Sequence, residues 1–504
     1  MNPIGRKTLI ACAVASALGS AAALALDPTQ TPDFTLYAAG GSAQANAFTA
    51  AANQLLNNPD SYSDSTSACT DSGSYRVWFG ATKNNLTANG ATVTAGTKLL
   101  MIYKFNGGSF PNGVAPQVDP GSNLPYPTTS AILSTSTTSQ TCTNAGAPKW
   151  FYSSSGQLTN NQLPDWGVSD VEVGMFQGYN NPGTCATNVT TTNCNGAAAP
   201  TVAGTDGIYD NLFGIAVTHN VYADPSHPKT NFTRAEMANI IAGNIGNWNQ
   251  LYADDGTQMS PGPIAFLDRG PGSGSKASGS QYFLGYPGAG SSAVLARSMK
   301  SGYTGTALNT STCTGTSTAN SLQDVNEGST TAVVNDLIAA QNANCRAVAV
   351  LGLENPPAFH QNGGSTNLYD FTAINGVFVD GHTTGDDINS TTNTSYKNAA
   401  SGAYDFYYQN SFNTRSGFLG GTSVGAIVAN AIITTMQAAT FPAANAGVAF
   451  PNAVSGTLQD ADKLSSPVAG GTMATRNKLS TSPLTPKFKA TNATSGVPTG
   501  LDPL

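Results

Sequence analysis

One local pattern recurs along the chain: an apolar stretch of strand character runs into a turn of small residues, and a helical pattern follows. FTLYAAGGS (34–42) precedes AQANAFTAAANQLL, whose apolar residues suit a helix packed on a sheet. TKLLMIYKFNGGSF (97–110) and GPIAFLDRGPGSGS (262–275) end in the same kind of turn. Strands that alternate with helices predict an α/β chain with mainly parallel sheets.

The same alternation continues through the rest of the chain. Thr233 and Glu236 stand at capping-box spacing and predict the start of a helix. Further strands are expected in LPDWGVSDVEVGMF (163–176), NLFGIAVTHNVY (211–222), RAVAVLGLE (346–354) and AINGVFVDG (373–381), and helices in TAVVNDLIAAQ (331–341) and VGAIVANAIITTMQAATF (424–441). Polar, cysteine-containing insertions are expected at about 57–164, and a polar tail at about 455–504.

The charge balance excludes two classes of partner. Only 10% of the 504 residues are charged, and 21 Lys and Arg against 28 Asp and Glu give a net charge of −7. The chain has no basic run that would attract nucleic acid. Its negative charge also argues against docking on anionic lipid.

The amino terminus has the pattern of a secretory signal peptide. Arg6 and Lys7 precede the apolar run TLIACAVASALGSAAALAL, and small residues near Ala25 offer a cleavage site. A lipoprotein cleavage at Cys12 is the weaker alternative, because most of the apolar run follows that residue. No later run of 18 apolar residues is found, so no membrane insertion is expected. The sequence therefore predicts a signal peptide at 1–25 and a periplasmic or secreted protein.

Cysteine use fits export. Cleavage removes Cys12 from the seven cysteines and leaves an even number, which predicts disulfides. Sequential pairing is favoured among the 15 possible connectivities, because it would close polar segments locally. Metal binding is the alternative, but no CxxC is found. The disulfide candidates are Cys69, Cys142, Cys185, Cys194, Cys313 and Cys345.

The strand–turn–helix pattern has a chemical meaning. Backbone N–H groups at a helix start lack intrahelical acceptors and lie at the positive end of the helix dipole, so they bind anions. Around RGPGSGS, Ser273, Gly274 and Ser275 would present such donors, and Arg269 would add a guanidinium fork. Ser42 and Ser109 occupy comparable turns. These turns could bind one small tetrahedral anion; a helix cap or a flexible joint is the simpler interpretation of any one of them.

Catalytic motifs are weak in this sequence. GTSVG (421–425) matches the nucleophile elbow of α/β-hydrolases, but that fold places its histidine after the serine, and none of the four histidines follows Ser423. The segment is therefore expected to cap a helix. Phosphate-loop and dinucleotide motifs are absent, so no nucleotide cofactor or metal is predicted. The four histidines are His219, His227, His360 and His382. His219 and His227 could be ligands, but they are eight residues apart without flanking carboxylates and are expected to be ordinary polar residues.

Three segments together resemble one family. FTRAEMANIIAGNIGNWNQ (232–250), RGPGSGS (269–275) and DWGVSDVE (165–172) are similar to motifs of PstS-like phosphate-binding proteins of bacterial ABC uptake systems. The resemblance implies a two-lobed type II periplasmic binding protein fold with a ligand cleft between lobes. One lobe would comprise 26–211 plus 376–504, and the other 212–375.

The resemblance also implies a ligand and its contacts. Arg269, Ser273, Gly274 and Ser275 would bind phosphate from one lobe, and Ser42, Ser109 and Asp170 from the other. Asp170 could accept the P–O–H proton of phosphate, whereas sulfate, which has no proton, would meet it as a like charge.

The expected function is therefore phosphate capture without catalysis and without a cofactor, and an ABC transporter permease is a possible partner. Two alternatives stay open: a secreted structural or adhesive protein on the same fold, and a phosphate-ester hydrolase.

Overall fold

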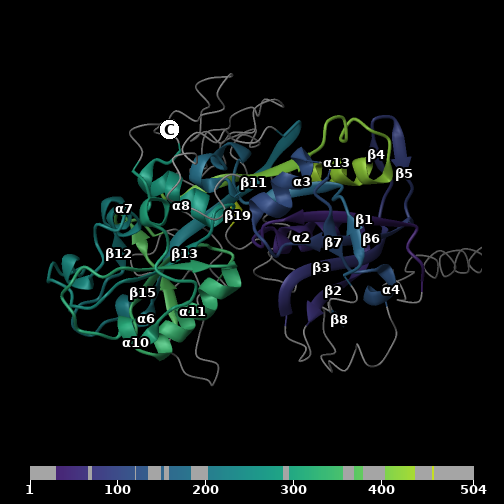
Figure 1. Ribbon diagram of the computed structural model, residues 1–504. Helices are drawn as coiled ribbons and strands as arrows, with labels where there is room; N and C mark the ends of the chain where they lie inside the picture. Colours follow the sequence, from purple (N-terminus) through teal and green to yellow (C-terminus); the bar gives the residue numbers. More distant parts are fainter. Residues whose placement is uncertain are drawn as a thin grey trace, which may run out of the picture.

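The computed structural model describes residues 30–65, 71–119, 121–133, 149–152, 158–182, 202–287, 294–355, 368–378, 403–437 and 457–458. Within these residues, one sheet of 13 strands runs through two lobes in the order β14-β13-β15-β11-β18-β10-β1-β6-β3-β2-β8, and β16 and β19 also pair with β11 (Figure 1). The predicted signal peptide, the predicted polar tail apart from residues 457–458, and four of the six disulfide candidates lie outside the described residues.

The first lobe, at the right of Figure 1, has β1 (Phe34–Gly40) at its centre. This strand pairs in parallel with β6 (Lys98–Lys104) and β10 (Trp166–Ser169). Helices α2 (Gln44–Leu55) and α13 (Val424–Met436) supply apolar side chains to its core, where Phe48 and Ile427 are buried. At the outer side, the sheet continues through β3 (Asp71–Thr82), β2 (Leu56–Ser65) and β8 (Lys149–Tyr152).

The second lobe has the same local plan around another parallel strand. β13 (Ala265–Arg269) lies between β14 (Gln323–Glu327) and β15 (Ala347–Gly352). Helices α7 (Arg234–Ile241), α8 (Gly274–Leu284) and α11 (Thr330–Asn342) surround these strands in Figure 1. A second apolar core, which includes Trp248, Phe266 and Leu337, holds this lobe together.

Two long strands pass from one lobe to the other. β11 (Gly204–Thr218) and β18 (Tyr407–Thr414) pair antiparallel, with a register shift between Gly207 and Asp210. On β11, Ile208 and Tyr209 pack in the core of the first lobe, whereas Leu212 packs in that of the second.

The remaining elements are short and lie mostly at the edges of the lobes. The strands are β4 (Leu86–Ala88), β5 (Ala91–Val93), β7 (Leu124–Tyr126), β9 (Asn160–Gln162), β12 (Asn231–Phe232), β16 (Tyr369–Phe371), β17 (Ala373–Ile374) and β19 (Thr457–Leu458). The helical segments are η2 (Ser109–Val114), α3 (Ala115–Val118), α4 (Thr129–Ile132), η4 (Val173–Met175), η5 (Gly178–Asn180), α6 (His219–Tyr222), η7 (Trp248–Gln250), α9 (Arg297–Ser301) and α10 (Thr310–Cys313).

The predicted α/β class is confirmed, with one difference in the sheet. Parallel pairing holds at the centre of each lobe, as the strand–turn–helix pattern predicts. The pairs that β11 makes with β15, β16 and β18, and the pairs of β3 with β2 and β6, are antiparallel. The sheet is therefore mixed rather than mainly parallel. In the described residues, no helix has the length and apolar character needed to cross a membrane.

The predicted helix caps are present. Thr233 and Glu236 form the capping box of α7, with each side chain bonded to the backbone of the other residue. Ser423 Oγ accepts from the Ala426 N–H at 3.2 Å and caps α13, so the GTSVG segment is a helix start, as expected. These caps fix where the helices begin.

One of the predicted disulfides lies in the described residues and is formed as expected, between Cys313 and Cys345. Both residues are buried in the core of the second lobe. The bond joins α10 to the residues just before β15 and spans a sequence separation of 32 residues.

Removing this bond should lower the stability of the chain. We expect the Cys313→Ala, Cys345→Ala double variant to lose about 3 to 4 kcal/mol of unfolding free energy, because closing a loop of this length restricts the unfolded chain. Urea unfolding of the double variant and the wild type under non-reducing conditions measures the difference. Equal midpoints would show that the bond does not stabilise the fold.

Candidate functional site

Turns from both lobes meet in one region. The hydroxyl of Ser42, in the turn before α2, donates to Thr330 Oγ1 at 3.2 Å. Thr330 is the first residue of α11 in the other lobe. Arg269, the last residue of β13, donates to the same oxygen through Nη1 at 2.7 Å. The starts of α2 and α11 and the end of β13 therefore adjoin.

Asp170 lies between the starts of α2 and α8. A Cβ atom on Gly274, the first residue of α8, would lie 2.7 Å from Asp170 Oδ2, and one on Gly41 would overlap Oδ1. Only glycine leaves room for the carboxylate at these two positions. Gln44 Nε2 donates to Asp170 Oδ1 at 3.0 Å, and the Asp170 N–H donates to Ser109 Oγ at 3.3 Å. A single carboxylate thus faces two helix starts, one from each lobe.

The charges in this region are buried and oppose one another. Arg269 and Asp170 are each 7% exposed. Burial raises the pKa of Asp170 above its usual value, although hydrogen bonds from Gln44 and Ser109 and the charge of Arg269 act against it. Burial lowers the pKa of Arg269, and the nearby carboxylates of Asp170, Asp268 and Glu327 act in the other direction. Each charge therefore helps to keep the other ionised.

Arg269 is held in place and keeps one amino group available. Arg269 Nε donates to the Glu327 carbonyl at 3.1 Å, and Tyr303 Oη donates to the Arg269 carbonyl at 2.7 Å. With Nη1 on Thr330, the guanidinium orientation is fixed. In the described part of the chain, Nη2 has no hydrogen-bond acceptor. A guanidinium fixed in this way can present its free edge to an oxyanion.

The start of α8 supplies backbone donors. Ser273 is the N-cap residue, and its Oγ faces the Lys276 N–H at 3.5 Å. Gly274 and Ser275 follow in the first turn, where N–H groups have no intrahelical acceptor. All three residues are buried. This helix start is therefore screened from bulk water and is positive in character.

The turn around Ser109 brings the lobes into backbone contact. Gly107 and Gly108 have φ angles of 119° and 92°, which favour glycine. They place Ser109 at the start of the π-helix η2, where it is fully buried. The next residue, Phe110, donates its N–H to the Gly272 carbonyl at 2.9 Å, and Gly272 has φ of 87°. Two glycine turns far apart in sequence thus touch directly.

All seven predicted site residues lie in this region. They are Ser42, Ser109, Asp170, Arg269, Ser273, Gly274 and Ser275. That they bind an anion stays a prediction.

Sequence reasoning missed two residues here, Gln44 and Thr330. Thr330 follows the strand–turn–helix pattern in VNEGSTTAVV, so the recurring unit could have revealed it. Gln44 is a fully buried amide at the start of an alanine-rich helix, and it also accepts from Tyr209 Oη.

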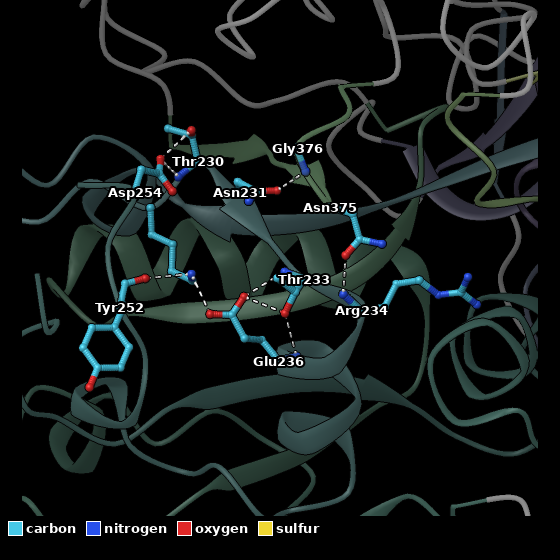
Figure 2. A network of polar contacts seen from close by, with 10 residues as sticks. Thr230, Asn231, Thr233, Arg234, Glu236, Tyr252, Asp254, Asn375 and Gly376 are labelled. Atoms are coloured by element: carbon cyan, nitrogen blue, oxygen red, sulfur yellow. Dashed lines mark hydrogen bonds and ion pairs between the residues drawn. The ribbon is translucent and has the colours of Figure 1, made fainter. Parts of the chain in front are cut away.

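FTRAEMANIIAGNIGNWNQ (232–250), one of the three motifs that carry the family resemblance, has a structural role and includes helix α7. Figure 2 shows the polar network around its first turn, where Lys229 Nζ donates to Glu236 Oε1 at 3.0 Å and to the Tyr252 carbonyl at 2.9 Å. In the same network, the Arg234 backbone N–H donates to Asn375 Oδ1 at 3.0 Å. No predicted site residue belongs to this network.

Arg234 links that network to α8. Its guanidinium lies 4.0 Å from the centre of the Tyr282 ring, and Nη2 donates to the Tyr282 carbonyl at 2.7 Å. Tyr282 lies in the last turn of α8, where a positive charge is favourable. The motif therefore supports the carboxyl end of the helix whose other end faces Asp170.

A buried ion pair lies behind the start of α8. Lys276 Nζ donates to the Asp268 carboxylate and to Ser298 Oγ, the latter at 2.9 Å. Burial opposes the charge of Lys276, but Asp268, Tyr303 and Asp324 together outweigh it and hold the pKa of Lys276 above its usual value. Burial, with repulsion from Asp268, raises the pKa of the nearby Asp324 to about 8. In the described residues, no group of three His, Cys, Asp or Glu side chains could hold a metal.

Comparison with known proteins gave only weak structural matches. No protein-family model matches the chain, and no curated protein is similar to it. A putative phosphate ABC transporter substrate-binding protein with bound phosphate from Clostridium perfringens is 12% identical, over 51% of this chain and 71% of that one, with a TM-score of 0.28. PstS from Borrelia burgdorferi is 15% identical over 63% and 88%, with a TM-score of 0.27. A phosphate-binding protein from Stenotrophomonas maltophilia is 13% identical over 51% and 66%, with a TM-score of 0.28.

Proposed function

We propose that this chain is an exported solute-binding protein that captures inorganic phosphate, or a similar tetrahedral oxyanion, between its lobes. The observation that carries the proposal is the convergence of helix starts from both lobes on one buried arginine and one buried carboxylate. Helix starts and a fixed guanidinium bind oxyanions without lysine. Because donors come from both lobes, one small anion could bridge them.

The buried carboxylate supports phosphate as the ligand. Phosphate keeps at least one P–O–H group near neutral pH, and Asp170 can accept that proton. Sulfate has no proton there and would place two negative charges in contact inside a buried site, which costs several kcal/mol. The site would therefore select its ligand by protonation as well as by shape.

The chain would bind phosphate without catalysing a reaction. The described side chains at the site are serine, threonine, glutamine, arginine and aspartate. His219 Nδ1 pairs with Asp370, and His227 Nδ1 pairs with Thr257. A phosphate-ester hydrolase stays the alternative, and a chromogenic phosphate ester distinguishes it, since a binding protein should leave the ester intact. A permease of an ABC transporter would be the receiving partner.

The proposed lobes follow from the sequence. Residues 26–211 with 376–504 would form one, and 212–375 the other. β11 and β18, which supply residues to both cores, would then be the connections that bend when the lobes open and close.

Equilibrium dialysis of the anion-free protein with labelled phosphate tests the function. We expect phosphate to bind and sulfate to compete at least about 100-fold more weakly. Asp170→Asn should narrow this difference, because an amide can donate to a fully deprotonated anion. Asp255→Asn, at an exposed aspartate, is the matched control. If the wild type binds neither anion, the proposed function is wrong.

A further inference from the structure

We propose that Thr330 is a further ligand of the anion. Its hydroxyl also accepts hydrogen bonds from Ser42 in the first lobe and from Arg269 in the second. The proposal rests on the oxyanion function proposed above and adds a residue that the sequence motifs do not include. Thr330 comes from the start of α11, a 13-residue helix, and is 8% exposed.

The two hydrogen bonds that the Thr330 hydroxyl accepts leave its proton without an acceptor among the described residues. A threonine hydroxyl has two acceptor lone pairs and one proton. Ser42 Oγ donates to Thr330 Oγ1 at 3.2 Å, and Arg269 Nη1 donates to it at 2.7 Å. Both lone pairs are then occupied, so Thr330 must donate its proton to a third group. Among the described residues it has no such acceptor.

An acceptor is needed because the hydroxyl is buried. An unsatisfied buried donor costs about 1 to 3 kcal/mol, so a site that leaves one in place is expected to have a partner for it. The neighbours of Thr330 indicate which kind of partner fits. Arg269 lies beside it with a free Nη2 edge, and the start of α11 adds positive character. A negatively charged oxygen is the acceptor that suits the Thr330 hydroxyl, the free edge of Arg269 and the start of α11.

The helix start itself is arranged to leave donors available. Ser329, the N-cap residue, accepts from the Ala332 N–H at 3.0 Å. The N–H groups of Thr330 and Thr331 precede that bond and have no intrahelical acceptor. The proton of the Thr330 hydroxyl and its backbone donor therefore belong to one helix start.

The position of Thr330 gives it a second effect. Its hydroxyl accepts from Ser42 in the first lobe and from Arg269 in the second. An anion that accepts a hydrogen bond from the Thr330 hydroxyl would polarise this hydroxyl and strengthen the two hydrogen bonds that it accepts. Ligand binding and contact between the lobes would therefore be coupled through one oxygen.

Thr330→Val tests the inference, because valine keeps the shape and removes the hydroxyl. By titration calorimetry with phosphate, we expect affinity to fall roughly 10- to 100-fold. Thr330→Ser, which keeps the hydroxyl, should stay within about 3-fold of the wild type. Thr331→Val is the matched control at the exposed next position and should bind as the wild type does. Thr330→Ala replaces the valine variant if that one fails to fold.

The outcomes separate this inference from the proposed function. If the wild type binds phosphate and Thr330→Val binds it equally well, the inference is wrong and the function stands. If affinity falls together with the melting temperature of the anion-free protein, and serine does not restore it, Thr330 is only a support and the inference is again wrong. If the wild type itself binds no phosphate, the proposed function fails and takes this inference with it.

Discussion

Arg269→Met should reduce phosphate affinity at least about 1000-fold, which corresponds to about 4 kcal/mol. Arg269 is buried, its guanidinium orientation is fixed by Glu327 and Thr330, and its charge faces Asp170. Methionine keeps most of the volume but leaves Asp170 without that cation. Repulsion between the carboxylate and the anion then adds to the lost hydrogen bonds. Titration calorimetry of the anion-free variant measures the change.

Arg346→Met is the matched control for this variant. Arg346 precedes β15, whose start lies at the opposite end of the parallel strands from Arg269, and it stacks on Trp248. Its loss should leave phosphate affinity unchanged. Retention of wild-type affinity in Arg269→Met would mean that the buried arginine has a structural role and that the ligand binds elsewhere.

Lys276→Met should have the largest effect on stability, a loss of about 3 to 5 kcal/mol of unfolding free energy. Lys276 is 4% exposed and donates to Asp268, which is 6% exposed. Without the lysine, that carboxylate stays buried and loses its hydrogen-bonded cation, and Asp324 lies near enough to repel it. Urea unfolding at neutral pH measures the loss, and Lys300→Met, at an exposed lysine in the same lobe, is the control.

A second substitution identifies the cause of that loss. Adding Asp268→Asn to Lys276→Met removes the uncompensated charge and should recover part of the stability. If Lys276→Met unfolds at the same urea concentration as Lys300→Met, the buried pair does not contribute to stability in the way that its contacts indicate.

Local patterns predicted the elements that position the site. Thr233 with Glu236 marks the start of α7, Ser423 marks that of α13, and the glycine–serine turn after Arg269 leads into α8. Capping residues and turn glycines act over a few neighbours, so the sequence carries this information directly. The recurring strand–turn–helix unit likewise predicted parallel pairing at the centre of each lobe.

Long-range features could not be predicted in this way. The antiparallel pairing of β11 with β18 joins residues about 200 positions apart, and no local pattern specifies which strands pair. The same limit explains the missed site residues. Thr330 follows the recurring strand–turn–helix pattern, but its contact with Arg269, 61 residues away in sequence, is not visible there. Gln44 becomes notable only when folding brings it to Asp170, 126 residues away.

We expect the helix starts of both lobes to converge with Arg269 on one oxyanion site, and arsenate tests this most directly. Arsenate is a tetrahedral oxyanion that carries a proton like phosphate, and its arsenic scatters anomalously. Crystals of the mature protein grown with arsenate should show one anomalous peak per chain, within hydrogen-bonding reach of Arg269, Ser42 and the Gly274 N–H. A chain with no peak there, or with its peak at another place, would contradict the assignment of this region as an oxyanion site.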